Sequence, residues 1–193
     1  LTEDEIIQIE SKVNEAIESS VPVATKVLSL EDAKKTGAVA FFEEKYGDIV
    51  RVIEMDKYSV EFCGGTHVSN TGNIKYFYIQ KESSPGAGNR RIEAVCGTPV
   101  IEFFQKEFQN LAQKTQEFNL KAKEVFKDSK NFIDSKIPSP EEVQDDFLKN
   151  GAATVKQYRD LKRSVEKELS EKTNLLTKEK KRLESEGNNS VLS

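Results

Sequence analysis

The stretch that decides how the first half of the chain folds is residues 61–68, which read Glu61–Phe62–Cys63–Gly64–Gly65–Thr66–His67–Val68. The alternation of Tyr58, Val60 and Phe62 with polar residues predicts a strand that ends at Cys63. The two glycines that follow do not continue a helix, and they admit backbone conformations barred to other residues. Cys63 and His67 are therefore predicted to be a strand-end thiol and a loop imidazole that a glycine turn brings together.

A thiolate and a neutral imidazole are donors that suit a borderline-soft divalent ion, with Zn²⁺ first. Cys63 and His67 are thus candidate metal ligands, and Glu61 is a further possible donor. Zinc takes three or four protein ligands, however, and His67 is the single histidine of the chain. We therefore expect an incomplete site. The spacing alone leaves a second interpretation open, in which a buried thiol lies beside a partly exposed histidine.

A second segment, residues 83–95, joins a glycine-rich loop to Arg90 and Arg91. The backbone N–H groups of such a loop and the guanidinium forks can bind an anion or a phosphate. The segment lacks the Lys-Ser/Thr ending and the helix of a P-loop, so it does not indicate a nucleotide site. The spacing also allows a flexible hairpin loop in which one arginine is paired with an acid.

The first helix is predicted directly after a capping box formed by Thr2 and Glu5. Its apolar residues recur at helical spacing and are Ile6, Ile9, Val13, Ala16 and Ile17. A strand over Val21–Leu30 follows, and then a short helix that Ser29 caps and Gly37 ends.

Further strands are predicted at Ile49–Met55, Tyr58–Cys63, Asn73–Lys81 and Arg91–Cys96, and Cys96 is predicted to pack in the core. Asp56–Lys57 has the length of a hairpin turn. Because the strands are short and separated by turns, the fold class is α+β, with a small antiparallel sheet and helices on one side.

The composition changes near Gly97–Thr98–Pro99, since eight of the ten glycines lie at or before that point. We therefore divide the chain into residues 1–97 and residues 98–193. One helical seam keeps an unbroken 3-4-3-4 spacing and consists of Ile101, Phe104, Phe108, Leu111, Thr115, Phe118, Ala122 and Val125. A second, less regular stripe consists of Tyr158, Leu161, Val165, Leu169, Leu176 and Leu183, with Gly151 as a gap before it.

Ile137–Pro138–Ser139–Pro140 breaks this helical region, and Ser139 with Glu142 restarts a helix through a capping box. A proline disfavours helix in the residue before it, so we expect the chain to reverse at Pro138–Pro140. The prediction is an antiparallel helical hairpin. The alternative is a coiled coil between two chains, which would make a homodimer through the helices.

The composition bounds the remaining possibilities. Apolar residues make up 36% and charged residues 32% of 193 residues, which suggests one compact domain with a charged helical extension. No run approaches the roughly 18 apolar residues of a membrane span. Two cysteines fit a reducing compartment, so we expect a cytoplasmic protein. The net charge is −4, so contact with nucleic acid would need a local basic patch. Because the chain opens with Leu1 and enters a helix at once, we also expect residues upstream.

Several segments, taken in their order along the chain, resemble those of a known protein family. They are Gly37–Val52, Cys63–Val68, Thr71–Ile74 and Ala87–Val95. At this order and spacing they resemble the editing domain of the alanyl-tRNA synthetase family over about residues 1–97. Residues 98–193 resemble, less specifically, the coiled-coil stretch that follows that domain. Cys96 stands where the family often has threonine, and Asn89 where valine is usual.

The resemblance implies a zinc-dependent hydrolase that clears serine or glycine mischarged onto alanine tRNA. A small amino-acid pocket cannot reject near-isosteres by binding alone, so a second site hydrolyses the wrong ester. The family holds zinc by a His-x₃-His helix plus a Cys and a His, and only Cys63 and His67 match here. Gly64, Gly65 and Thr66 would shape the ester pocket, and Arg90 or Arg91 would contact phosphates of the tRNA.

The family's ATP-dependent aminoacylation core and its glycine-rich carboxy-terminal domain have no match in this sequence. The resemblance therefore implies that ATP serves only the parent enzyme, and we expect the isolated chain to be inactive. Two alternatives stay open. One is a free-standing deacylase of the same superfamily. The other is a non-enzymatic module, in which the phenylalanine seam pairs chains and the basic cluster Lys178–Arg182 touches RNA.

Overall fold

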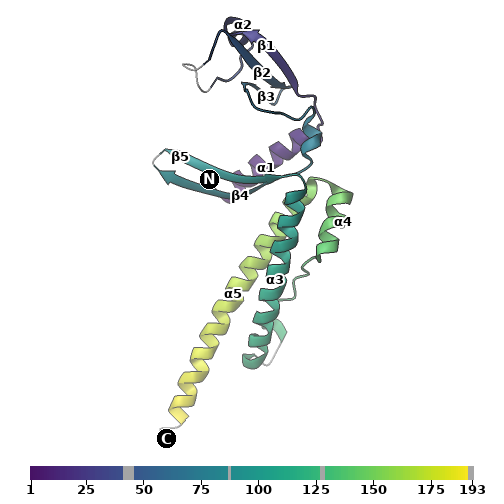
Figure 1. Ribbon diagram of the computed structural model, residues 1–193. Coiled ribbons are helices and arrows are strands. Elements are labelled where there is room, and N and C mark those ends of the chain that lie inside the picture. The colour runs from purple at the N-terminus through teal and green to yellow at the C-terminus, as the bar shows by residue number, and fades with distance from the viewer. Residues whose placement is uncertain (41–45, 87, 127–128, 191–193) are drawn as a thin grey trace. The chain divides into compact units, whose positions relative to one another are not determined.

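A computed structural model describes residues 1–40, 46–86, 88–126 and 129–190 (Figure 1). The chain divides into two compact units, Leu1–Val100 and Ile101–Ser193. Residues 41–45, within the resemblance over Gly37–Val52, and Ala87 in the glycine-rich loop lie outside the described residues.

Helix α1 spans Glu3–Glu18 and begins as predicted, with a capping box between Thr2 and Glu5. Its buried residues coincide with the predicted apolar stripe only at Ile17. They are Glu10, Asn14 and Ile17, whereas Ile6, Ile9, Val13 and Ala16 are half-buried. The reason is that α1 packs against the edge of a strand, where polar side chains can satisfy backbone groups.

The first sheet is antiparallel and three-stranded among the described residues, in the order β1-β2-β3. Its strands are β1 (Ala24–Ser29), β2 (Ile49–Met55) and β3 (Ser59–Phe62). Helix α2 (Leu30–Lys35) begins at the predicted cap, where the Ser29 hydroxyl accepts from the Asp32 N–H. It covers one face of the sheet through a core of Ala33, Val50, Val52 and Phe62. The turn between β2 and β3 follows the prediction, with Asp56 at a φ of 48°.

A second sheet is formed by the hairpin of β4 (Phe77–Gly86) and β5 (Asn89–Cys96), after a 3-10 turn, η2 (Thr71–Ile74). Two predictions are therefore wrong. The strands form two sheets instead of one, and the strand expected from Asn73 begins only at Phe77. Cys96 is also exposed instead of buried, since the outer strand β5 is exposed along most of its length.

Helix α1 covers the open edge of β4. The Asn14 side chain donates to the Phe77 carbonyl (2.9 Å) and accepts from the Phe77 N–H (2.9 Å). One turn earlier, the Glu10 carboxylate accepts from the Ile79 N–H at 2.5 Å. These side chains take the place that a neighbouring strand would occupy, which explains why polar residues are the buried face of α1.

The second unit contains α3 (Thr98–Val125), the 3-10 turn η3 (Ser129–Asn131), α4 (Pro140–Asn150) and α5 (Ala153–Ser190). The predicted seam of α3 is confirmed, because every member is buried except Val125, which is half-buried. The rings of Phe104, Phe108, Phe147 and Tyr158 form its centre, with centroids 5.0–6.0 Å apart. Leu183, the last member of the second stripe, is 43% exposed.

The predicted antiparallel hairpin is wrong in direction. The start of α3 meets the start of α5, since Phe108 and Tyr158 have ring centroids 5.0 Å apart. The end of α3 meets the middle of α5, where Phe118 clusters with Leu176. The two long helices therefore run in the same direction, as Figure 1 shows. The reversal expected at Pro138–Pro140 is wrong too, because Ile133 already lies back against Asn119 of α3. The chain turns again at Gly151, which ends α4 at a φ of 62°.

The segment before α4 explains this arrangement. Residues 132–139 return along α3, held where the Asn119 side chain bonds both the N–H and the carbonyl of Ile133, each at 2.9 Å. Pro138–Pro140 then starts α4, with the predicted capping box of Ser139 and Glu142. Within the described residues, no helix is both long and apolar enough to cross a membrane.

Candidate functional site

The candidate site lies at the end of β3. Pairing between β2 and β3 joins Val52 to Phe62, and it extends one residue further because the Cys63 N–H donates to the Arg51 carbonyl at 3.1 Å. Phe62 faces the α2 core, so the alternation of the strand points Cys63 to the opposite face. The strand geometry thus places the thiol away from the core of its own sheet.

Cys63 and His67 lie side by side, as predicted. The Cys63 Sγ and the His67 Nε2 are 3.2 Å apart, and both residues are half-buried. The thiol is therefore not sealed among apolar residues, and an imidazole nitrogen is within its reach.

The two donors fit one edge of a metal site. At usual Zn–S and Zn–N bond lengths and a tetrahedral angle, the sulfur and nitrogen of two ligands lie about 3.6 Å apart. The observed distance between the Cys63 Sγ and the His67 Nε2 is 3.2 Å, so the two atoms would have to separate only slightly to bind the same zinc ion. Within the described ranges, no group of three or more His, Cys, Asp or Glu side chains could hold a metal. Glu61, the further possible donor, instead accepts from the Ser59 hydroxyl at 3.2 Å.

Gly64, Gly65 and Thr66 form the exposed turn between the two candidate ligands. A Cβ on Gly65 would lie 3.6 Å from the Cys63 Sγ, so the turn folds back against the thiol. A Cβ on Gly64 would meet nothing within 4 Å. A side chain at position 64 would therefore extend into open space, whereas one at position 65 would touch the thiol.

Arg90 and Arg91 lie elsewhere, on β5 of the second sheet. Arg90 pairs with Glu82 (2.8 Å) and Arg91 with Glu93 (3.2 Å). The hydrogen bond from Arg90 is the main cause that lowers the pKa of the Glu82 carboxyl. These contacts match the open alternative of a hairpin loop whose arginines are paired with acids. Both guanidinium groups still face solvent, at 59% and 67% exposed.

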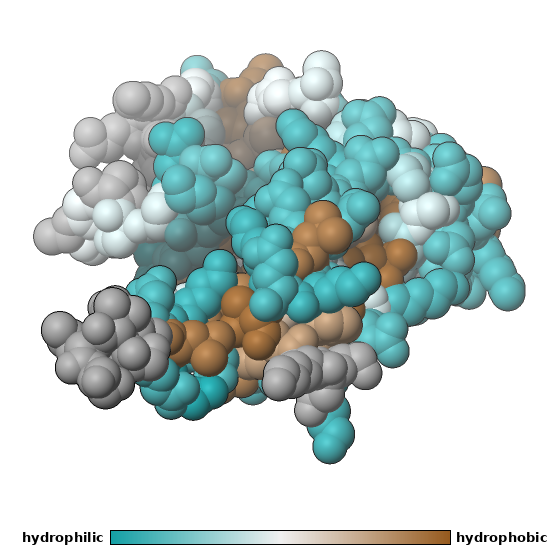
Figure 2. Space-filling model, turned by 90° about the horizontal axis from the view of Figure 1, so that it is seen from below, coloured by the Kyte–Doolittle hydropathy of each residue, from teal (hydrophilic) through white to brown (hydrophobic). Residues whose placement is uncertain are grey.

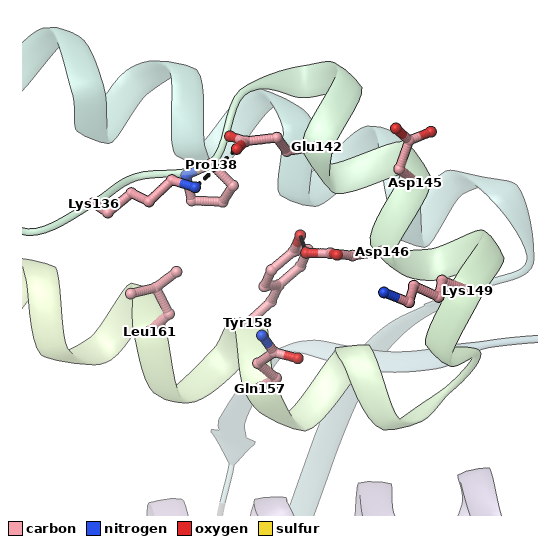
Figure 3. A pocket seen from close by; sticks show the side chains of 9 residues that line it. All are labelled: Lys136, Pro138, Glu142, Asp145, Asp146, Lys149, Gln157, Tyr158 and Leu161. Atoms are coloured by element: carbon pink, nitrogen blue, oxygen red, sulfur yellow. Dashed lines mark hydrogen bonds and ion pairs between the residues drawn. The ribbon is translucent and has the colours of Figure 1, made fainter.

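The helical unit has hollows of its own, distinct from the Cys63–His67 pair. One of about 520 Å³ lies between α4, α5 and the segment before α4 (Figure 3). Four of its polar side chains are paired, Lys136 with Glu142 at 2.9 Å and Tyr158 with Asp146 at 2.6 Å. Burial and the bond to Asp146 raise the pKa of the Tyr158 hydroxyl.

On the face shown in Figure 2, hydrophobic residues form separate patches among hydrophilic ones.

Sequence reasoning missed Arg51. Its guanidinium Nη1 donates to the Gly65 carbonyl, inside the glycine turn. A signal was available, because Arg51 interrupts the otherwise apolar run Ile49–Ile53 of a strand that pairs on both sides.

The comparison with known families identifies the class of protein. Residues 50–93, which contain β2 except Ile49, β3 and the glycine turn, match the family described as the threonyl and alanyl tRNA synthetase second additional domain. The first unit thus carries a domain that belongs to aminoacyl-tRNA synthetases, the ligases of protein biosynthesis.

The whole chain is more specifically similar to alanine–tRNA ligases. It is 53% identical over its full length to those of Leptospira borgpetersenii serovar Hardjo-bovis and Leptospira interrogans serovar copenhageni. It is 41% identical over 84% of its length to that of Fervidobacterium nodosum. The chain spans about a fifth of the length of these curated relatives. It therefore corresponds to a segment of an alanine–tRNA ligase.

Proposed function

We propose that this segment contributes to the editing activity of an alanine–tRNA ligase, which removes serine or glycine wrongly attached to alanine tRNA. The observation that carries the proposal is the Cys63–His67 pair, 3.2 Å apart in a glycine turn of the domain shared with threonyl and alanyl synthetases. The parent enzyme would attach alanine to its tRNA with ATP. ATP would serve that parent reaction only.

Cys63 and His67 would be two of the protein ligands of a zinc ion, and further ligands would come from outside the described residues. When bound, zinc polarises an ester carbonyl and lowers the pKa of a bound water. The Gly64–Gly65–Thr66 turn would shape the pocket for the aminoacyl ester, since Gly65 lies against the thiol and Gly64 borders open space. Hydrolysis of the ester would join a water oxygen to the carbonyl carbon and break the ester bond, and the tRNA ribose oxygen would leave with a proton from the water.

Alanine tRNA is the proposed partner. Arg90 and Arg91 would contact its phosphates, which would require each guanidinium to exchange or share its carboxylate partner. The alternative of a dimer through the phenylalanine seam has less support, because Phe104 and Phe108 are already covered by α4 and α5 of the same chain. The basic cluster near the end of α5 is partly paired too, since Arg182 bonds Glu179 and Glu186.

Metal binding is tested by titrating the 193-residue chain with Co²⁺ in a Cys96→Ser background, in which Cys63 is the single remaining thiol. We expect weak binding with thiolate-to-metal charge-transfer absorption, because the chain supplies two donors. Cys63→Ser should abolish that absorption, and His67→Ala should weaken binding at least about tenfold. Unchanged spectra in both variants would refute the assignment of these ligands.

The isolated chain is expected to hydrolyse seryl-tRNA for alanine at close to the blank rate. A catalytic zinc has three protein ligands, and the described residues bring two together. The measurement is release of labelled serine with and without added zinc. Rapid release that a chelator abolishes would contradict the expectation and favour a free-standing deacylase.

A further inference from the structure

Arg51 is placed to control the glycine turn that carries the candidate ligands. It lies in the middle of β2, between β1 and β3, and it is paired with Val27 of β1. Its main-chain carbonyl accepts from the Cys63 N–H at 3.1 Å. Its side chain crosses to the turn, where Nη1 donates to the Gly65 carbonyl. One residue thus holds both the entry of the turn and its middle.

The turn has little other support. Beyond it, the Val23 N–H donates to the Ser69 carbonyl at 3.0 Å, which holds the far end. Between Gly64 and Val68, the Arg51 guanidinium is the one group among the described residues that hydrogen-bonds the backbone. Glycines have the largest conformational freedom to lose, so a single charged bond at Gly65 has a large influence on which conformation they adopt.

The conformation of the turn sets the distance between the two ligands. Gly65 packs against the thiol, since its missing Cβ would lie 3.6 Å from the Cys63 Sγ. His67 follows two residues later and reaches the same sulfur with Nε2. A turn released from Arg51 would let His67 move away from Cys63, because among the described residues only the Cys63–His67 contact itself would then oppose that movement.

We propose that Arg51 is a positioning residue, which acts through Gly65 to hold His67 against Cys63. The inference rests on the proposed metal-binding function but can be tested without metal. Groups that orient metal ligands typically change metal affinity about 10–100-fold when removed. We therefore expect Arg51→Ala to weaken Co²⁺ binding at least about tenfold, while the fold is retained.

The test uses the Cys96→Ser chain with ¹⁵N-labelled histidine. His67 is the single histidine of the chain, so both ring nitrogen signals belong to this residue. The variants are Arg51→Ala, Arg51→Lys, which keeps a donor but loses the planar fork, and Lys26→Ala. Lys26→Ala is the matched control, because it removes an exposed cation from the neighbouring strand β1, where Lys26 pairs with Glu54. Circular dichroism and thermal melting verify that each variant is folded.

In Arg51→Ala, the ring nitrogen signals should move to those of a free histidine, and Arg51→Lys should restore them in part. Lys26→Ala should leave them unchanged. If Arg51→Ala keeps the signals and the Co²⁺ affinity of the control, the inference is wrong. If Arg51→Ala does not fold, the ring nitrogen signals and the Co²⁺ affinity of Arg51→Lys are compared with those of Lys26→Ala. Equal values in these two variants would then show that the inference is wrong. If the parent chain binds no Co²⁺, the proposed function fails, whereas the metal-free signals still decide the role of Arg51.

Discussion

Replacing Phe104 with alanine is expected to lower the free energy of unfolding of the helical unit by about 3–5 kcal/mol. Phe104 is fully buried, and its ring lies 5.6 Å from that of Tyr158 and 6.0 Å from those of Phe108 and Phe147. It therefore joins all three helices, α3, α4 and α5. Its removal leaves a cavity that three separate elements would have to collapse to fill.

The measurement is urea unfolding followed by helical circular dichroism, which reports mainly the second unit. Leu148→Ala is the control, because Leu148 lies on α4 next to Phe147 but is 70% exposed. It should change the unfolding free energy by less than about 0.5 kcal/mol. Equal midpoints for the two variants would show that the ring cluster is not the centre of this unit.

Asn14→Ala is expected to cost the first unit about 2–4 kcal/mol, because it leaves two backbone groups of Phe77 without a partner. Asn14 is 7% exposed, and its side-chain amide matches both the N–H and the carbonyl of Phe77. Truncation also opens the edge of β4, since this pair is part of what attaches α1 to the hairpin.

Asn14→Asp separates the two bonds. An aspartate still accepts from the Phe77 N–H, but its second oxygen faces the Phe77 carbonyl, so it should be at least as destabilising as alanine at neutral pH. Asn73→Ala is the matched control, because that amide is exposed and makes a single 3.3 Å bond to Ser69. Thermal unfolding and amide hydrogen exchange at Phe77 are the measurements. Protection of Phe77 that is unchanged in Asn14→Ala would contradict this account.

Much of the local structure could be predicted from the sequence. The structure confirms the predicted capping boxes at Thr2 and Ser139, the strand Ile49–Met55 and the seam from Ile101. Each depends on residues within one or two turns of one another. The contact between Cys63 and His67 was predictable for the same reason, since a four-residue glycine turn leaves their side chains few other places to lie.

Errors arose where the partner is distant in the chain. Glu10 and Asn14 are buried because they bond Ile79 and Phe77, which lie 69 and 63 residues further on. Nothing in α1 itself marks these polar residues as a packing face. The prediction that Cys96 packs in the core is wrong for the complementary reason. An apolar alternation shows which side chains share a face, but it does not show whether anything covers that face.

The sequence by itself determined the α+β class, the helical second region and the pairing of one thiol with one imidazole. Tertiary structure decided the direction of the long helices. A stripe of apolar residues indicates which face of a helix is buried, but a parallel and an antiparallel neighbouring helix can bury that face equally well. The return of residues 132–139 along α3, held by Asn119 on Ile133, places α4 so that α5 must run parallel to α3. Arg51 became a site residue in the same way, because only the folded chain brings its guanidinium to the Gly65 carbonyl.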